Sequence, residues 1–178
     1  MTKGTLTGRV ALITGVSRRQ GIGYGIAERL AAFGADLFIH AFSSFDAAQP
    51  WGADPGGRDA IVTALQRHGT KITQAEADLL DPKSPQRLVT AANQALGHID
   101  ILIANHAYST LGELEDLTAE EIDKPLRINV RGTLLLTQAF AAQHDGRSGG
   151  RVILLTSGQH LGPMPKELAY VASKGALH

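Results

Sequence analysis

Apolar and polar positions along the chain follow two alternating patterns. Short runs of apolar and β-branched residues, typical of β-strands, occur five times. They lie at residues 9–13, 37–40, 71–77, 101–104 and 151–155. Between them, apolar residues recur at helical spacing, as Ile22, Ile26 and Leu30 do. Each helical segment therefore has one apolar stripe that can pack on a sheet.

This alternation predicts an α/β fold with a doubly wound parallel sheet. Because the predicted strands are apolar on both faces, we expect helices to cover both sides of the sheet and to join the strands by right-handed crossovers. The sequence shows no internal repeat at a period of roughly 20–50 residues, and no linker divides it. We therefore expect residues 1–178 to form a single domain.

Two segments depart from the simple alternation. Residues 118–143 have a mostly helical pattern that begins at a capping box formed by Thr118 and Glu121. Pro125 lacks a backbone donor and clashes with the preceding turn, so we expect a break or kink near Lys124. Residues 43–57 are rich in glycine and proline and predict a long loop. Trp51 in this loop covers an adenine, lines a partner surface or, as is more common, packs against a neighbouring helix.

Composition limits the classes of function. Seventeen Lys and Arg residues balance seventeen Asp and Glu residues, which argues against nucleic acid or an anionic membrane as a partner. The sequence contains no cysteine, which excludes disulfides and cysteine nucleophiles, and its histidines have no metal-ligand spacing. No apolar run approaches the roughly 20 residues of a membrane span, and no secretion signal is evident. We expect a cytoplasmic protein without a metal that acts on a small molecule.

The turn after the first predicted strand carries the first candidate chemistry. Residues 14–23 read TGVSRRQGIG and lead directly into a predicted helix. A glycine-rich turn in this position presents backbone N–H groups and the positive end of a helix to a pyrophosphate. The alternative is a tight strand-to-helix turn that binds nothing.

The end of the second predicted strand bears on which dinucleotide would bind. Residues 40–43 read HAFS and offer no carboxylate to a ribose 2′-hydroxyl. Arg18 and Arg19 lie in the glycine-rich turn, where a guanidinium can pair with a 2′-phosphate. This combination favours NADP(H) over NAD(H). The alternative is that both arginines are solvated loop charges.

Tyr170 and Lys174 form a second candidate group. They are four residues apart and share one face of a helix. A cation this close lowers the tyrosine pKa from about 10 toward the range in which the phenol exchanges a proton near neutrality. Ser157 follows the fifth predicted strand, at the edge where open parallel sheets bind ligands. Taken alone, a pair such as Tyr170 and Lys174 is common by chance and more often belongs to an ordinary helix surface.

Several motifs occur together in an order that resembles the short-chain dehydrogenase/reductase family. They are Thr14-Gly15 with Gly21-Ile22-Gly23, Asp78, Ala104-Asn105-His106-Ala107, Asn129-Val130-Arg131-Gly132, Ser157, and Tyr170 with Lys174. The likeness extends from Leu6 to His178, and the 3-oxoacyl-carrier-protein-reductase-like branch looks most similar. It implies a Rossmann-type sheet of order 3-2-1-4-5 whose final strand or strands are missing by truncation at His178. It also implies a homodimer or homotetramer at full length.

The resemblance implies a role for each matched residue. Tyr170 would be the general acid or base, Lys174 would hold the nicotinamide ribose, and Ser157 would bond the substrate oxygen. Asn129 would hold a water that relays protons, Asp78 would approach the adenine, and Asn105 would pack near its ribose. The expected catalytic residues are Asn129, Ser157, Tyr170 and Lys174. The expected cofactor-binding residues are Gly15, Ser17, Arg18, Arg19, Gly21, Ile22, Gly23, Asp78, Leu79, Asn105, Tyr170 and Lys174.

The sequence departs from the family pattern in two further places. Five residues separate Gly15 from Gly21 instead of the family's three, a length that also resembles enoyl-thioester reductases. In those enzymes tyrosine and lysine are seven residues apart, so a carbonyl or secondary alcohol substrate is favoured here. His106 replaces a small residue of the family motif, and we expect a loop histidine without a catalytic role. A catalytically silent nucleotide-binding or oligomerising module remains the alternative from a different class.

Overall fold

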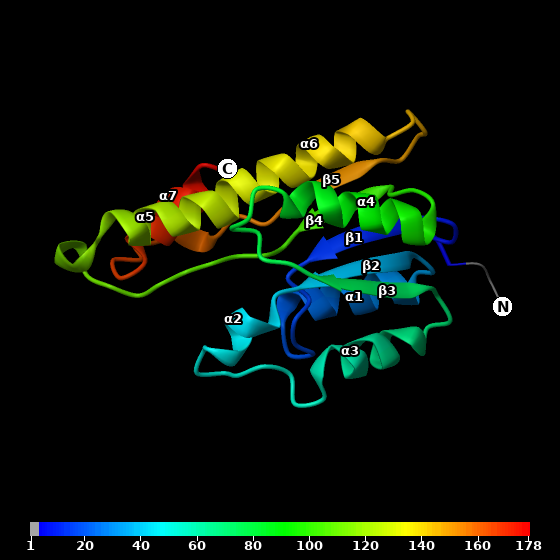
Figure 1. Cartoon of the computed structure of the whole chain (residues 1–178), viewed down its shortest axis with the longest axis horizontal. Helices are drawn as coiled ribbons and strands as arrows, with labels where there is room; N and C mark the ends of the chain where they lie inside the picture. The colour runs from blue at the N-terminus through cyan, green and yellow to red at the C-terminus, as the bar shows by residue number, and fades with distance from the viewer. Residues whose placement is uncertain (1–3) are drawn as a thin grey trace.

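The computed structural model describes residues 4–178, which fold around one parallel sheet. Its strands occur in the order β3-β2-β1-β4-β5 (Figure 1). Their bounds are β1 (Val10–Thr14), β2 (Asp36–Ala41), β3 (Ile72–Glu76), β4 (Ile101–Ala104) and β5 (Arg151–Leu154). The parallel sheet and its 3-2-1-4-5 order, predicted from the sequence, are confirmed.

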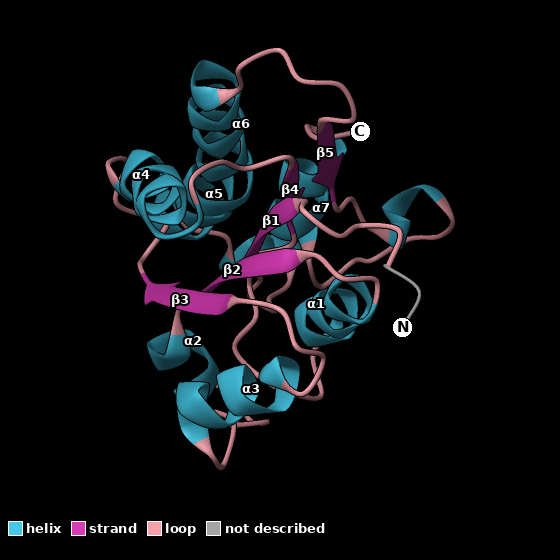
Figure 2. Ribbon diagram, turned by 90° about the vertical axis from the view of Figure 1, so that its right-hand side faces the viewer, coloured by secondary structure: helices cyan, strands magenta, loops and turns pink. Residues whose placement is uncertain are grey.

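Helices cover both faces of the sheet (Figure 2). On one face, α1 (Ile22–Ala32) and α3 (Gly57–Gln66) pack against the alternate strand residues Ala11 and Ile13. On the other face, α4 (Ser84–Leu96) and α6 (Thr133–Gln143) pack against Leu12. The two-residue period of a strand thus divides β1 between two buried clusters, as expected for a doubly wound sheet.

The remaining helical elements are short. They are α2 (Ser43–Ala47), η1 (Leu114–Asp116), α5 (Ala119–Pro125), η2 (Leu126–Gly132), η3 (Gly158–His160) and α7 (Leu168–Gly175). The expectation of loop throughout residues 43–57 is therefore wrong for α2, while the chain between α2 and α3 has no regular structure. Contacts of this short helix with distant residues stabilise it: Phe45 meets Tyr108, and Asp46 pairs with Arg18.

One long helical segment, formed by α5, η2 and α6, crosses the molecule (Figure 1). The predicted capping box is confirmed, because Thr118 Oγ1 accepts a bond from Glu121 N and Thr118 N donates to Glu121 Oε2. The predicted break near Lys124 is wrong. Pro125 keeps helical angles, φ −59° and ψ −40°, and the chain continues as the π-helix η2. The wider π winding shifts the hydrogen-bond register, which lets the helix pass the missing proline donor.

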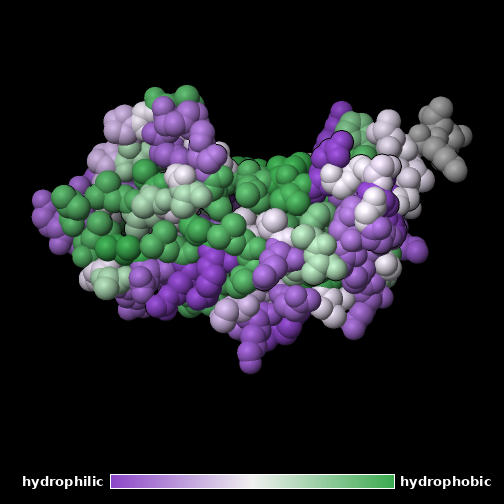
Figure 3. All heavy atoms as spheres, turned by 90° about the horizontal axis from the view of Figure 1, so that it is seen from above, coloured by the Kyte–Doolittle hydropathy of each residue, from purple (hydrophilic) through white to green (hydrophobic). Residues whose placement is uncertain are grey.

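The outer surface of this helical segment is partly apolar. Ile122, Leu126 and Leu134 are exposed, and Figure 3 shows apolar side chains gathered on the face that carries α6. At the sheet edge, Val152 and Ile153 of β5 are exposed as well. Among residues 4–178, no helix combines the length and apolar character needed to cross a bilayer.

Candidate active site

The carboxyl ends of β1 to β4 surround a cavity of about 690 Å³. This is the edge at which open parallel sheets bind ligands, and the volume suits a cofactor. Most residues predicted to bind a cofactor line it. These are Gly15, Ser17, Arg18, Gly21, Ile22, Gly23, Asp78, Leu79 and Asn105. Arg19, Tyr170 and Lys174, which were also predicted, lie outside this lining, as does Ser157.

The glycine-rich turn forms one wall of the cavity. Gly15 has a φ of +75°, and a Cβ added there would lie 2.8 Å from Asn105 Nδ2. A Cβ on Gly23 would lie 2.4 Å from the carbonyl oxygen of Gly15. Both positions therefore require glycine. No described side chain caps the N-terminus of α1 at Gly21, so its first amides and its positive end are available to an anion.

Asn105 fastens this turn to the loop after β4. Its Nδ2 donates to the carbonyl oxygens of Thr14 and Gly15, both at 3.0 Å, and its backbone N–H donates to Thr14 Oγ1 at 3.1 Å. These bonds hold the two loops together across the cavity floor. Asn105 thus has a structural role in addition to the predicted approach to a ribose.

His106 lies in the loop after β4, as expected, but its side chain is buried. Its Nε2–H donates to the carbonyl of Ile128 at 3.1 Å, and its Nδ1 accepts from Thr14 Oγ1 at 2.8 Å. Burial lowers the pKa of His106 to about 3, so the ring stays neutral. Because both nitrogens bond to neighbouring groups, the geometry indicates a positioning residue behind the turn.

His40, at the end of β2, supports the turn from the other side. Its Nε2–H donates to the carbonyl of Ala77 at 2.8 Å, and its Nδ1 accepts from Gly15 N at 3.4 Å. Burial lowers the pKa of this histidine as well. Two neutral imidazoles, His40 and His106, therefore hold the ends of β1, β2 and β3 in a fixed relation.

Arg18 and Arg19 have different surroundings. Arg18 lines the cavity and donates from Nε to Asp46 Oδ1 at 3.0 Å. Arg19 forms a bidentate pair with Asp54, with Nη2 at 2.7 Å from Oδ1 and Nε at 3.0 Å from Oδ2. This bonding lowers the pKa of Asp54 to about 2. Both arginines thus have carboxylate partners, and their predicted contact with a 2′-phosphate stays a prediction.

Asp78 and Leu79 lie beside the cavity as predicted. Asp78 Oδ1 accepts from Leu80 N at 2.8 Å, which forms a tight turn after β3. Leu79 is buried and packs with Leu12 and Leu136 under the opposite face of the sheet. The turn thus presents a carboxylate and an apolar surface to the same cavity.

Tyr170 and Lys174 share one face of α7. Lys174 Nζ lies 5.9 Å from the centroid of the Tyr170 ring and donates to the carbonyl of Leu155 at 2.8 Å. Lys174 is only 2% exposed, and this burial lowers its pKa. A lysine in this setting gives up its proton more readily than a surface lysine does. Ser157 follows two residues after Leu155 and is partly buried.

Asn129 links the cavity to α7. Its Oδ1 accepts from Tyr108 N at 2.8 Å, and its Nδ2 donates to Tyr108 O at 2.9 Å and to Ser173 Oγ at 2.8 Å. Asn129 belongs to the π-helix η2 and is fully buried. It therefore contacts both the loop that carries Tyr108 and the helix α7. Its hydrogen bonds reach Ser173, the neighbour of Lys174, and the predicted water relay to Lys174 stays a prediction.

A family model described as short chain dehydrogenase matches residues 9–178. The chain belongs to the short-chain dehydrogenase family. Versicolorin reductase 1 of Aspergillus parasiticus is 34% identical over 173 residues, an alignment that covers 97% of this chain and 61% of the relative.

Solved structures agree with this assignment. A short-chain dehydrogenase from Burkholderia cenocepacia J2315 in complex with NADP is 35% identical with a TM-score of 0.81, covering 97% of this chain and 65% of that one. A 3-oxoacyl-[acyl-carrier protein] reductase from Brucella melitensis is 31% identical with a TM-score of 0.79, covering 95% and 65%. The chain thus spans less than two thirds of the length of these relatives.

Several cavity residues of this short-chain dehydrogenase were not predicted from its sequence, and four of them carry charge or an aromatic ring near Arg18 or Tyr108. Asp46, Phe45, Tyr108 and Lys124 all line the cavity. Lys124 Nζ lies 4.7 Å from the Tyr108 ring centroid, which lies 5.5 Å from that of Phe45. The sequence does carry one signal for the loop: two aspartates in residues 43–57 match the two arginines of the glycine-rich turn.

Trp51 is 53% exposed and lines the cavity, so it is not buried against a neighbouring helix. Its contact with an adenine or a partner surface stays a prediction. Its Nε1–H donates to Asp46 Oδ1 at 2.9 Å.

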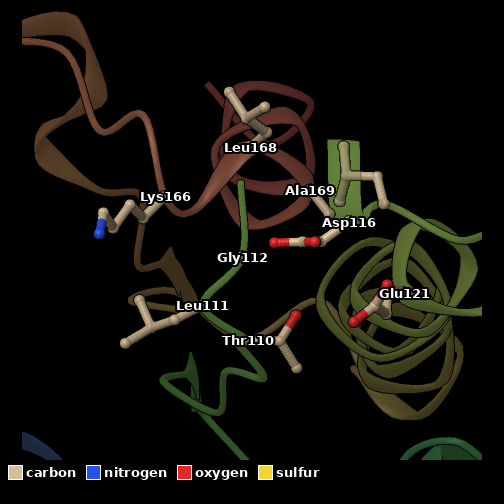
Figure 4. A pocket seen from close by; sticks show the side chains of 9 residues that line it. Thr110, Leu111, Gly112, Asp116, Glu121, Lys166, Leu168 and Ala169 are labelled. Carbon is tan, nitrogen blue, oxygen red and sulfur yellow. The ribbon is translucent and has the colours of Figure 1, made fainter. Parts of the chain in front are cut away.

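A second cavity lies closer to α7. Figure 4 shows that it lies between the loop after β4, the first turns of α5 and the start of α7, with Glu121 and Leu168 among its lining residues. Its volume is about 10 Å³, enough for about one water molecule. It is too small for an organic substrate. Within residues 4–178, no group of three or more His, Cys, Asp and Glu side chains is arranged to hold a metal ion.

Proposed function

We propose that the protein is an NADP(H)-dependent oxidoreductase that interconverts a carbonyl compound and a secondary alcohol. The observation that carries this proposal is the uncapped glycine-rich turn of α1, which opens into a cavity at the carboxyl edge of the sheet. The turn suits a pyrophosphate, because the amides of Ile22 and Gly23 at the start of α1 have no side-chain cap and the lack of a Cβ at Gly23 lets the turn pack closely. The buried Lys174 lies beside Tyr170 on α7. It donates a hydrogen bond to the carbonyl of Leu155, which directly follows β5, the strand next to β4 in the sheet.

Residues that line the cavity, together with Lys174 of α7, would each hold one part of the dinucleotide. The turn would hold the diphosphate, Asp78 and Asn105 the adenosine, and Lys174 the nicotinamide ribose. Arg18 would bind a 2′-phosphate, which supports NADP(H) over NAD(H), and the Burkholderia relative was crystallised with NADP. Arg19 would act indirectly, because its guanidinium is already paired with Asp54. When bound, the nicotinamide supplies or accepts the hydride.

The chain itself would supply orientation and a proton. In carbonyl reduction, Tyr170 Oη would give its proton to the substrate oxygen, while Ser157 Oγ would donate a hydrogen bond to the same oxygen. Lys174, whose pKa burial lowers, would favour the phenolate left on Tyr170 and return a proton to it. Asn129 would keep Tyr108 and Ser173 in place beside this path. In alcohol oxidation the same proton moves in reverse.

We further propose a 3-oxoacyl thioester as the substrate class. The similar Brucella structure bears the name of such a reductase. The spacing of four residues between Tyr170 and Lys174 supports ketone chemistry over enoyl reduction. The exposed apolar side chains of α5, η2 and α6 support assembly as a homodimer or homotetramer.

Replacing Tyr170 by Phe tests the chemistry separately from binding. Tyr170→Phe removes the phenolic proton but keeps the ring, so kcat should fall by at least about 100-fold. NADPH affinity, measured by its fluorescence on titration, should stay within about twofold, since main-chain amides and Arg18 carry most of it. Turnover is followed as NADPH oxidation with acetoacetyl thioesters and simple ketones. Retained turnover removes Tyr170 from this role, and wild-type binding without any turnover identifies a silent nucleotide-binding module instead.

A further inference from the structure

The loop after β2 places an acid and an indole at the rim of the cavity, next to Arg18. Asp46 is 7% exposed, and its Oδ1 accepts from Arg18 Nε at 3.0 Å and from Trp51 Nε1 at 2.9 Å. The guanidinium carbon of Arg18 lies 5.2 Å from the Trp51 ring centroid. All three residues line the cavity. One buried carboxylate oxygen therefore fixes both an arginine and the ring on which it rests.

We propose that Asp46 and Trp51 determine nucleotide specificity: Trp51 forms a wall at the adenosine end, and Asp46 sets how strongly Arg18 favours a 2′-phosphate. This inference rests on the proposed function, because it assigns roles at the rim of the proposed dinucleotide cavity. It adds two residues that belong to none of the matched family motifs.

The bond to Asp46 orients Arg18 without using all its donors. It occupies Nε–H, and the two terminal NH₂ groups remain as donors for a phosphate. Stacking on Trp51 restricts the guanidinium further, so less conformational entropy is lost when a ligand binds. By orienting Arg18, Asp46 therefore favours the binding of either dinucleotide at this rim.

The charge of Asp46 acts in the opposite direction. A 2′-phosphate that approaches Arg18 is repelled by the neighbouring carboxylate, whereas a 2′-hydroxyl is not. Burial increases this effect, since few waters screen the carboxylate. With Asp46 as its partner, Arg18 should therefore favour NADPH over NADH less strongly than it would beside a neutral hydrogen-bond acceptor. The protein should accept NADH as a measurable second cofactor.

The pair formed by Arg19 and Asp54 provides a matched comparison. It joins the same loop to the same turn, and Asp54 Oδ1 also accepts from Gly56 N at 3.1 Å. Neither residue lines the cavity. Its role is to fasten the loop, so changing its charge should leave the choice of nucleotide unchanged.

The decisive variant is Asp46→Asn. Asparagine keeps an oxygen that can accept both bonds but removes the negative charge. Adenosine 2′,5′-bisphosphate and NADPH should bind about threefold to tenfold more tightly by calorimetry at low salt, and NADH should change less than about twofold. Arg18→Ala should remove the preference for the 2′-phosphate altogether. Asp54→Asn, the control, should leave the NADPH to NADH ratio of affinities unchanged. An unchanged ratio in Asp46→Asn overturns the proposed role of Asp46.

The role of Trp51 can be measured by fluorescence, because it is the only tryptophan of the chain. Adenosine 2′,5′-bisphosphate should change its emission on binding, since the ligand covers a half-exposed indole. This ligand carries no reduced nicotinamide, which excludes energy transfer as the cause. If calorimetry shows that the bisphosphate binds but the Trp51 emission does not change, Trp51 does not form a wall of the site, and the proposed function still stands. A wild-type protein that binds neither NADPH nor the bisphosphate overturns the proposed function and this inference together.

Discussion

At the scale of single residues, the candidate site depends on buried polar side chains with complete sets of partners. His106 and His40 hold the glycine-rich turn as neutral rings, and Asn129 holds Tyr108 by both backbone groups. The sequence gives little warning of this, because Thr14, the partner of His106, is 92 residues away. A histidine in a loop motif looks solvent-exposed until the opposite wall is known.

The buried state of His106 predicts how stability depends on pH. Its folded pKa, about 3, is below the unfolded value of about 6.5, so between these values only the unfolded chain binds the proton. The free energy of unfolding should therefore fall as pH drops below about 6.5, by about 1.4 kcal/mol per pH unit from this residue. Urea unfolding at pH 7.5 and 5.5 measures this slope. His106→Gln should flatten it, and an unaltered slope would show that His106 is accessible to protons in the folded state.

At the scale of elements, the turn between β1 and α1 separates two kinds of glycine. A Cβ at Gly23 would meet the Gly15 carbonyl oxygen at 2.4 Å, whereas a Cβ at Gly25, two residues further along α1, meets nothing within 4 Å. Gly23→Ala should therefore distort the turn and reduce NADPH affinity by at least about tenfold. Gly25→Ala should keep affinity and raise the free energy of unfolding by about 0.5–1 kcal/mol, because alanine favours helix. Calorimetry and urea unfolding of both variants decide this, and equal affinities would contradict the assigned role of the turn.

Most elements follow directly from the hydrophobic pattern, and the exceptions have physical causes. The five strands and the helices α1 and α4 lie where apolar periodicity predicts them, since that pattern is what the sheet buries. The helix α2 was missed because pairs such as Asp46 with Arg18 stabilise it, and these are absent from local sequence. The break expected at Pro125 was wrong because π winding and packing carry the helix past it. Motif residues such as Asp78 were predictable, whereas Asp46 required the folded loop.

At the scale of the whole molecule, Asp100 joins three strands at the amino edge of the sheet. Its carboxylate accepts from Arg9 Nη1 and Val10 N, both at 2.9 Å, and its backbone carbonyl accepts from Arg151 N at 2.9 Å. Burial would raise the pKa of this carboxyl, but the bonds from Val10 and Arg9 outweigh it and the pKa is lowered. A lowered folded pKa means that this stabilisation is complete above the unfolded value of about 4 and is lost as pH falls further.

Asp100→Asn should therefore weaken the whole fold at neutral pH. Removing one partner of a buried ion pair costs about 3 kcal/mol, and the loss should appear in one cooperative urea transition. Asp145→Asn is the matched control, because the Asp145 and Arg147 pair is exposed and such pairs contribute little. If both variants unfold at the wild-type midpoint, the sheet edge does not depend on Asp100.

The most direct test of the central claim is a crystal structure of the protein with NADP⁺ bound. The diphosphate should lie on the main-chain amides of Ile22 and Gly23, with the 2′-phosphate at Arg18 and the nicotinamide ring facing Tyr170 and Lys174. A dinucleotide bound elsewhere at saturating concentration, or a nicotinamide directed away from α7, would contradict the account.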